Sequence, residues 1–211
     1  MRCRGSPAEV RSGAPSRYEV YPPREDTFLL LPFATVAPGT RVLEVGTGSG
    51  VVALAAARSG GRVVATDRNV HALRELHDVA LREHLEVAAV RTDLARGLGR
   101  FDRVLANPPY LPTHPGEEDP DPGARLALDG GPDGCRVLTR LLSDLPNHLA
   151  DGAVAFVVVS TVQDRRGLAE VRDAWRGRGG SVEVAATRPL EGEELSVWKL
   201  GLSSPEGARS V

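Results

Sequence analysis

Apolar residues recur along this chain with two periods, one typical of buried strands and one typical of amphipathic helices. Short apolar runs, including the continuously apolar segment 153–160, predict strands buried in a sheet. Segments with apolar residues every three or four positions predict helices that cover such a sheet. We expect strands at 41–45, 62–66, 87–91, 101–106, 153–160, 181–187 and 195–201, and helices at 24–37, 49–59, 69–84, 134–149 and 164–177. The apolar face of the helix at 69–84 comprises Val70, Leu73, Leu76, Val79, Ala80 and Leu81.

The alternation of strands and helices predicts the fold class. Strands that alternate with helices form βαβ units and a mostly parallel sheet. The segment between the last two strands is too short for a crossover helix, so these strands are expected to pair antiparallel. The prediction is an α/β fold with a seven-stranded, doubly wound, Rossmann-like sheet that is mostly parallel and has an antiparallel last strand. Ligands of such sheets bind beyond the carboxyl ends of the strands, where the strand order reverses.

Length and composition favour one folded domain. The chain has 211 residues, of which 41% are hydrophobic and 26% charged, which are ordinary values for a globular protein. Residues 18–202 are expected to form the domain. The segments 1–17 and 203–211, which are rich in small and polar residues, are expected to be a flexible leader and a flexible tail.

Charge and cysteine usage exclude several classes of function. A net charge of −2 argues against general attraction to nucleic acid phosphates. The two cysteines, Cys3 and Cys135, have no metal-ligand spacing, so free thiols and no metal site are predicted. No apolar run is long enough to span a membrane, and the leader has no apolar signal region, so the predicted location is the cytoplasm.

The segment Asn107-Pro108-Pro109-Tyr110 follows the predicted strand at 101–106. Each proline fixes its own backbone and keeps the preceding residue extended, so Asn107 is expected to project its carboxamide from the sheet. The Asn107 side-chain oxygen and the Pro108 carbonyl are then two acceptors for the hydrogens of one amino group. Tyr110 is interpreted either as a wall of this substrate site or as an aromatic residue packed at the strand end.

A glycine-rich loop at 46–50 connects the first strand to a helix and is expected to bring the backbone close to a ligand. Val51 stands where a dinucleotide fingerprint requires glycine. Asp67 ends the second strand, where a carboxylate can accept hydrogen bonds from both hydroxyls of a ribose or can cap the next helix. Asp93 follows the third strand, where it is either an acceptor for the amino group of adenine or part of a solvated loop. Glu44 precedes the loop and would repel a pyrophosphate, which favours a cationic ligand without phosphates.

S-adenosylmethionine has these properties, because it combines an adenosine, a sulfonium and an amino acid. The chain resembles the HemK/PrmC-type class I methyltransferases, and more closely their short HemK2-like branch, which are release-factor glutamine methyltransferases. The resemblance rests on segments in family order: 21–30 (YPPREDTFLL), 46–50 (GTGSG), Asp67, Asp93-Leu94, 107–110 (NPPY) and 129–134 (DGGPDG). Asn-Pro-Pro-Tyr alone is also found in DNA and RNA methyltransferases.

The resemblance implies a role for each matched residue. Thr27 is expected to contact the methionine end of S-adenosylmethionine, and Glu44, Gly46 and Gly48 are expected to line the cofactor pocket. Asp67 is expected to hold the ribose, and Asp93 with the Leu94 backbone the adenine. Asn107, Pro108 and Tyr110 form the catalytic site, where Asn107 binds the substrate amide beside the cofactor's methyl group. The loop at 111–131 is expected to grip the substrate.

The resemblance implies methylation of the glutamine in a Gly-Gly-Gln loop of a translation release factor. It also implies a small zinc-binding activator subunit as a partner, on the edge of the third strand at Val87, Ala88 and Val90. Two alternatives stay open at this point: an amino-methyltransferase that acts on a nucleic acid base or a small metabolite, and a non-catalytic subunit that binds S-adenosylmethionine.

Overall fold

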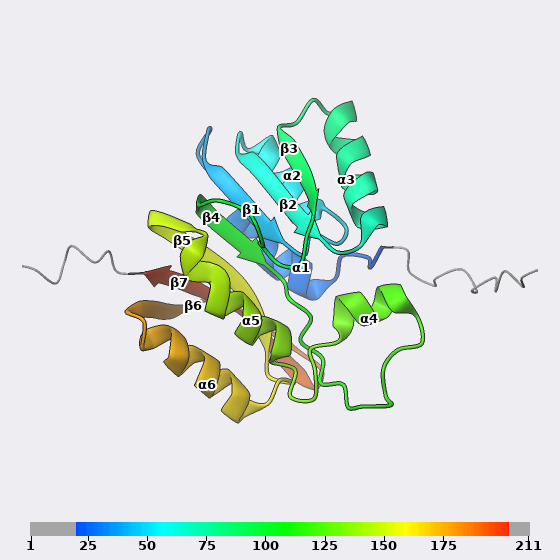
Figure 1. The fold of residues 1–211 in the computed structure, drawn as a ribbon, viewed down its shortest axis with the longest axis vertical. Coiled ribbons are helices and arrows are strands. Elements are labelled where there is room, and N and C mark those ends of the chain that lie inside the picture. The colour runs from blue at the N-terminus through cyan, green and yellow to red at the C-terminus, as the bar shows by residue number, and fades with distance from the viewer. Residues whose placement is uncertain (1–19, 203–211) are drawn as a thin grey trace, which may run out of the picture.

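The computed structural model describes residues 20–202, which form one seven-stranded sheet with helices on both faces (Figure 1). The predicted leader 1–17 and tail 203–211 lie outside the described residues. The strands are β1 (Arg41–Val45), β2 (Arg62–Asp67), β3 (Val87–Arg91), β4 (Phe101–Ala106), β5 (Leu149–Ser160), β6 (Gly180–Leu190) and β7 (Glu193–Leu202). The helices are α1 (Glu25–Leu30), α2 (Val51–Arg58), α3 (Val70–Arg82), α4 (Pro122–Leu128), α5 (Arg136–Asp144) and α6 (Arg165–Arg176), with short 3₁₀ turns η1 (Leu31–Ala34) and η2 (Leu145–Asn147).

The strand order confirms the predicted topology. The order across the sheet is β3-β2-β1-β4-β5-β7-β6. β1 pairs parallel with β2 and β4, β2 with β3, and β4 with β5. β7 runs antiparallel to both β5 and β6. The order therefore reverses between β1 and β4, and this is where a doubly wound sheet binds its ligand.

The two faces of the sheet carry separate hydrophobic cores. Alternating residues of β5 illustrate this, since Val157 packs in one core and Val158 in the other. The first core joins the sheet to α5 and α6 and contains both Trp175 and Trp198. The second joins it to α1, α2 and α3. Both faces are thus covered, which explains why the central strands are apolar without alternation.

Prolines shorten two of the predicted helices. The helix predicted at 24–37 is wrong in its second half, because Pro32 lies at the start of η1 and lacks the N–H that an α-helix interior requires. The helix predicted at 134–149 ends at Asp144, because Pro146 opens the turn η2. The chain then enters β5 at Leu149, four residues before the predicted start, and a register shift opposite Phe101 accommodates the extra residues.

Three smaller predictions are also corrected. Leu81 is 61% exposed, because the last turn of α3 lies over the edge strand β3 and nothing covers it there among the described residues. The loop predicted at 111–131 contains the short helix α4, which Asp121 caps by accepting hydrogen bonds from the backbone of Gly123 and Ala124. The helix after the glycine loop begins at Val51, because Gly50 has a φ of 76°.

No helix within residues 20–202 is long and apolar enough to cross a bilayer.

Candidate functional site

A cavity of about 430 Å³ lies beyond the carboxyl ends of the central strands, at the reversal of strand order. This volume is within the range of small-molecule sites. Every residue that the sequence singled out lines this cavity: Thr27, Glu44, Gly46, Gly48, Asp67, Asp93, Leu94, Asn107, Pro108 and Tyr110. The structure therefore brings together residues from segments that are far apart in the sequence.

The loop between β1 and α2 brings the backbone of two glycines to the cavity. Gly46 and Gly48 have φ values of 72° and 49°, a conformation that residues with a Cβ rarely adopt. An added Cβ at either position would meet no atom within 4 Å, so both glycines face open space. The Gly48 N–H donates to Asp67 Oδ2 at 2.9 Å, which fixes the loop against the end of β2.

Glu44 is a buried carboxyl group at the base of the cavity, with an exposed fraction of 4%. Its Oε2 accepts a hydrogen bond from the Thr47 hydroxyl at 2.5 Å and from the Ala53 N–H at 3.0 Å. Burial nevertheless dominates and raises the pKa of Glu44 to about 8. A cationic group in the cavity would stabilise the charged carboxylate, so this site favours a ligand with a positive centre.

Asp67 is anchored by the backbone on both of its oxygens. Oδ2 accepts from Gly48, and Oδ1 accepts from the Asn69 N–H at 2.8 Å. The helix that follows is capped by Asn69, whose side chain accepts a hydrogen bond from the His71 N–H. The interpretation of Asp67 as the cap of this helix is therefore wrong. Each carboxylate oxygen has two acceptor positions, so Asp67 retains one on each oxygen for a pair of hydroxyls.

Asp93 and Leu94 lie at the far side of the cavity, after β3. Leu94 has a φ of 57°, an uncommon conformation for a bulky residue. The Asp93 carboxylate is not simply solvated, because Arg140 of α5 donates to its Oδ2 at 2.5 Å. Arg140 also lines the cavity.

The Asn107 carboxamide has a buried acceptor without a partner. Its Oδ1 has no hydrogen-bond partner among the residues that the structure describes, although it is shielded from solvent. Buried polar atoms in native proteins are nearly always paired, so one left unpaired at a cavity wall indicates a position for a ligand donor. Pro108 is buried beside it and lines the same cavity.

Tyr110 lines the cavity and is fixed by a carboxylate from α1. Its hydroxyl donates to Asp26 Oδ2 at 3.2 Å, and burial, followed by the charge of Asp26, raises the pKa of Tyr110 above its ordinary value. Asp26 Oδ1 accepts from the Thr27 N–H at 2.7 Å. Asp26 therefore links the segment around Thr27 to the segment around Asn107.

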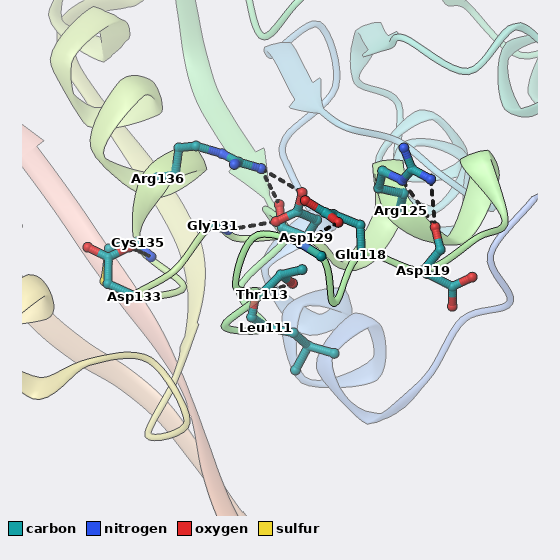
Figure 2. Close-up of polar contacts among 11 residues, drawn as sticks. Leu111, Thr113, Glu118, Asp119, Arg125, Asp129, Gly131, Asp133, Cys135 and Arg136 are labelled. Atoms are coloured by element: carbon teal, nitrogen blue, oxygen red, sulfur yellow. Dashed lines mark hydrogen bonds and ion pairs between the residues drawn. The ribbon is translucent and has the colours of Figure 1, made fainter.

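The connection from Tyr110 to α5 is held by a dense set of polar contacts (Figure 2). Asp129 Oδ1 accepts from the Gly131 N–H at 2.8 Å, and its other oxygen pairs with Arg136 at 2.8 Å. Burial alone would raise the pKa of Asp129, but the hydrogen bonds from Arg136 and Gly131 bring it below its ordinary value. Through backbone bonds between Leu111 and the chain at 128–130, these contacts fix α4 against the cavity, where Leu126 and Leu128 are part of its wall.

Among the polar residues of the cavity that the sequence did not single out are Asp26, Arg140 and Glu193. Asp26 lies inside the matched segment 21–30, so the resemblance indicates that it lies near the site. Its hydrogen bond to Tyr110 could not be predicted from the sequence. Arg140 reads as an ordinary exposed residue of an amphipathic helix. Glu193 reaches the cavity only because β7 turns back along β5, and it accepts a hydrogen bond from Ser160 there.

This arrangement fits S-adenosylmethionine. It offers a buried carboxyl for a cation, an anchored carboxylate for two hydroxyls, a further carboxylate acceptor at Asp93 and an unpaired amide oxygen at Asn107. Within residues 20–202, no group of three or more His, Cys, Asp and Glu side chains is placed to hold a metal ion.

Comparison with known proteins gives the same result. The methyltransferase small domain family matches residues 25–120. A Methanocaldococcus jannaschii protein provisionally named as a protein N5-glutamine methyltransferase is 35% identical over 86% of this chain and 93% of its own length. The mouse methyltransferase HEMK2 is 35% identical over 88% of this chain and 91% of its own length. The Encephalitozoon cuniculi Mtq2–Trm112 complex, which methylates the termination factor eRF1, contains a chain with a TM-score of 0.68, at 25% identity over 88% of this chain and 99% of that one.

The fold and these relatives define an S-adenosylmethionine-dependent methyltransferase of class I. The sheet order, the glycine loop and the cavity at the strand reversal are the structural basis of that class. The chain belongs to the HemK/PrmC-type methyltransferase family, and its similarity to HEMK2 extends over almost the full length of both chains.

Proposed function

We propose that this protein transfers a methyl group from S-adenosylmethionine to the side-chain amide nitrogen of a glutamine, in the Gly-Gly-Gln loop of a translation release factor. The observation that carries the proposal is the unpaired, buried Oδ1 of Asn107 at the wall of the cavity. A primary amide has two N–H donors and can satisfy this oxygen. The relatives named for glutamine or eRF1 methylation support the same acceptor.

The cofactor is proposed to lie along the cavity from Thr27 to Asp93. Glu44 and Thr27 hold its amino acid end, Asp67 its ribose hydroxyls, and Asp93 with the Leu94 N–H its adenine. When bound, S-adenosylmethionine supplies an electrophilic methyl group on a sulfonium. The glycines at 46 and 48 let the backbone approach this ligand closely, because neither carries a side chain.

The reaction needs an oriented nucleophile, because an amide nitrogen is weak: its lone pair is delocalised into the carbonyl. Asn107 Oδ1 and the Pro108 carbonyl accept the two N–H groups, which fixes the nitrogen and stabilises the positive charge that develops on it. Tyr110, held by Asp26, closes the side of the site. Once the methyl group is transferred, the nitrogen loses a proton to water, so no dedicated base is required.

Replacing Asn107 tests this proposal. We expect Asn107→Ala to lower single-turnover methylation about 10²–10³-fold, the typical cost of removing one preorganised polar partner, while S-adenosylhomocysteine still binds. The measurement uses labelled cofactor and purified release factor, followed by peptide mass mapping. A gain of one methyl group on a glutamine supports the proposal. Methylation near the wild-type rate, label on nucleic acid or a metabolite, or tight binding without any transfer would each contradict it.

A partner subunit is proposed for the edge of the sheet at β3. The Mtq2 relative forms a complex with Trm112. In this chain β3 pairs with β2 on one side only, and Ala88 and Leu81 are exposed beside its open edge. An open strand edge next to an exposed leucine offers backbone and apolar contacts to a small activator, for which zinc binding stays a prediction.

The edge can be tested by mutation. We expect Leu81→Arg to abolish co-purification with a Trm112-type subunit and to leave the melting temperature within about 2 °C, since an exposed substitution rarely costs more than about 0.5 kcal/mol. Val184→Arg is the matched control, because Val184 is also exposed (60%) but lies on β6 at the opposite edge. Equal loss of the subunit in both variants would argue against β3 as the docking edge.

A further inference from the structure

Arg140 makes a contact at the cavity rim that the matched motifs do not account for. Its guanidinium donates to Asp93 Oδ2 at 2.5 Å, across 47 residues of sequence. Val137, which lies three residues before Arg140 on the same helix face, also lines the cavity, and so does the adjacent Leu141. α5 therefore presents Arg140 to the cavity rather than to bulk solvent alone.

The backbone beneath this contact is held in a strained conformation. Leu94 adopts a φ of 57° next to the buried Ala95, and it packs against the core that contains α5. A left-handed conformation is unfavourable for a bulky residue and persists only where the surroundings impose it. The chain at 93–94 is therefore fixed in space. The Asp93 side chain, in contrast, is 36% exposed, and within residues 20–202 Arg140 is the one group that hydrogen-bonds to its carboxylate.

We propose that Arg140 is a positioning residue that makes the cavity selective for an adenine base. By engaging Oδ2, it holds the Asp93 carboxylate in one orientation, with Oδ1 available as an acceptor. An ionised carboxylate only accepts hydrogen bonds, so it matches the exocyclic amino group of adenine and opposes the O6 oxygen of hypoxanthine. This inference rests on the proposed function only for the identity of the cofactor.

Binding of two cofactor analogues to the full-length chain tests the inference. S-adenosylhomocysteine and S-inosylhomocysteine differ only in the base, and calorimetry with each requires no methyl acceptor. For the wild type we expect at least about 100-fold tighter binding of the adenosine analogue. A fully built polar site can discriminate by about 10⁴–10⁵-fold, but Asp93 is only partly buried. Arg140→Met should reduce this ratio to about 10-fold or less, chiefly through weaker binding of the adenosine analogue, because a charge-assisted bond no longer orients Asp93. Arg140→Lys should restore part of the ratio.

A double-mutant cycle distinguishes positioning from a general structural effect. In an Asp93→Ala background, Arg140→Met should change the ratio less than twofold, because Arg140 acts through Asp93. Arg58→Met is the control, since Arg58 forms a comparable ion pair with Glu83 but does not line the cavity. It should leave both affinities unchanged.

Three results would overturn the inference: equal weakening of both analogues by Arg140→Met, no change in either, or a full effect of Arg140→Met in the Asp93→Ala background. The proposed function is tested separately. It would be contradicted if no glutamine were methylated, even if the ratio of the two analogue affinities behaved as expected.

Discussion

Glu44 shows how one residue can oppose stability and favour binding. Its pKa is raised to about 8 by burial, above the ordinary value of 4.5. A raised pKa in the folded state means that the stability from this group is complete below pH 4.5 and is lost as the pH rises through about 8. The carboxyl is therefore largely protonated in the ligand-free protein at neutral pH, and a cationic ligand releases that proton on binding.

Glu44→Gln should remove this pH dependence. We expect the variant to be more stable than the wild type at pH 9 by roughly 2–5 kcal/mol and similar to it at pH 5, because an amide does not titrate and its oxygen can still accept from Ala53. Urea unfolding from pH 5 to 9 measures the difference. Glu83→Gln is the control, since the pKa of Glu83 is lowered by the hydrogen bond from Arg58 and changes nothing in this range. If the unfolding free energies of the wild type and Glu44→Gln changed with pH in the same way, the raised pKa of Glu44 would be refuted.

Binding of S-adenosylmethionine should weaken in the same variant.

Among the elements, the connection at 129–134 controls the position of Tyr110. Gly134 has a φ of 71°, and an added Cβ would collide with the Tyr110 carbonyl oxygen. Gly130 is also crowded, because an added Cβ there would lie 2.9 Å from the Tyr110 carbonyl carbon. These glycines therefore let two loops pack backbone to backbone. This packing fixes the end of the Asn-Pro-Pro-Tyr segment at Tyr110.

Gly134→Ala should displace this segment. We expect a loss of about 2–4 kcal/mol in unfolding free energy and a fall in turnover larger than any change in cofactor affinity, because the substrate side of the cavity moves. Gly116→Ala is the matched control: Gly116 has a φ of 92°, but no atom lies within 4 Å of its added Cβ. It should cost about 1 kcal/mol and leave turnover unchanged. The prediction fails if both variants behave alike in chemical denaturation and single-turnover assays.

At the scale of the whole molecule, the sheet joins two hydrophobic cores, and only one of them contains tryptophan as a fluorescent probe. The two tryptophans, Trp175 and Trp198, both belong to the core on the α5 and α6 side. Leu76 is 1% exposed in the opposite core. If the domain unfolds as one unit, a cavity in the second core must shift the tryptophan signal of the first.

Leu76→Ala should therefore lower the unfolding free energy by about 2–5 kcal/mol, as measured by tryptophan fluorescence and by far-ultraviolet circular dichroism with the same midpoint. Leu81→Ala on the same helix is the control, since Leu81 is 61% exposed, and it should change stability by less than about 0.5 kcal/mol. A fluorescence midpoint that stays at the wild-type value while the dichroism shifts would show that the two faces unfold independently.

The difference between local rules and contacts that span long stretches of sequence explains what could be predicted from the sequence. The mostly parallel sheet and the position of Glu44, Asp67 and Asn107 at one edge of it follow local rules, because parallel strands bring their carboxyl ends to one edge. The contacts of Asp26 with Tyr110 and of Arg140 with Asp93 span 84 and 47 residues and depend on how α1 and α5 pack. The exposure of Leu81 depends on which strand is at the edge, and the helix pattern alone does not contain that information.

The lone acceptor of Asn107 also bears on protein ageing. Glutamine slowly hydrolyses to glutamate, which would present a carboxylate oxygen to the unpaired Oδ1 of Asn107, where the amide presents an N–H donor. If the proposed site is correct, repulsion between these oxygens would disfavour the damaged side chain without any separate proofreading step. A release factor whose glutamine has deamidated would then remain unmethylated, so the methyl group would be found only on an intact glutamine.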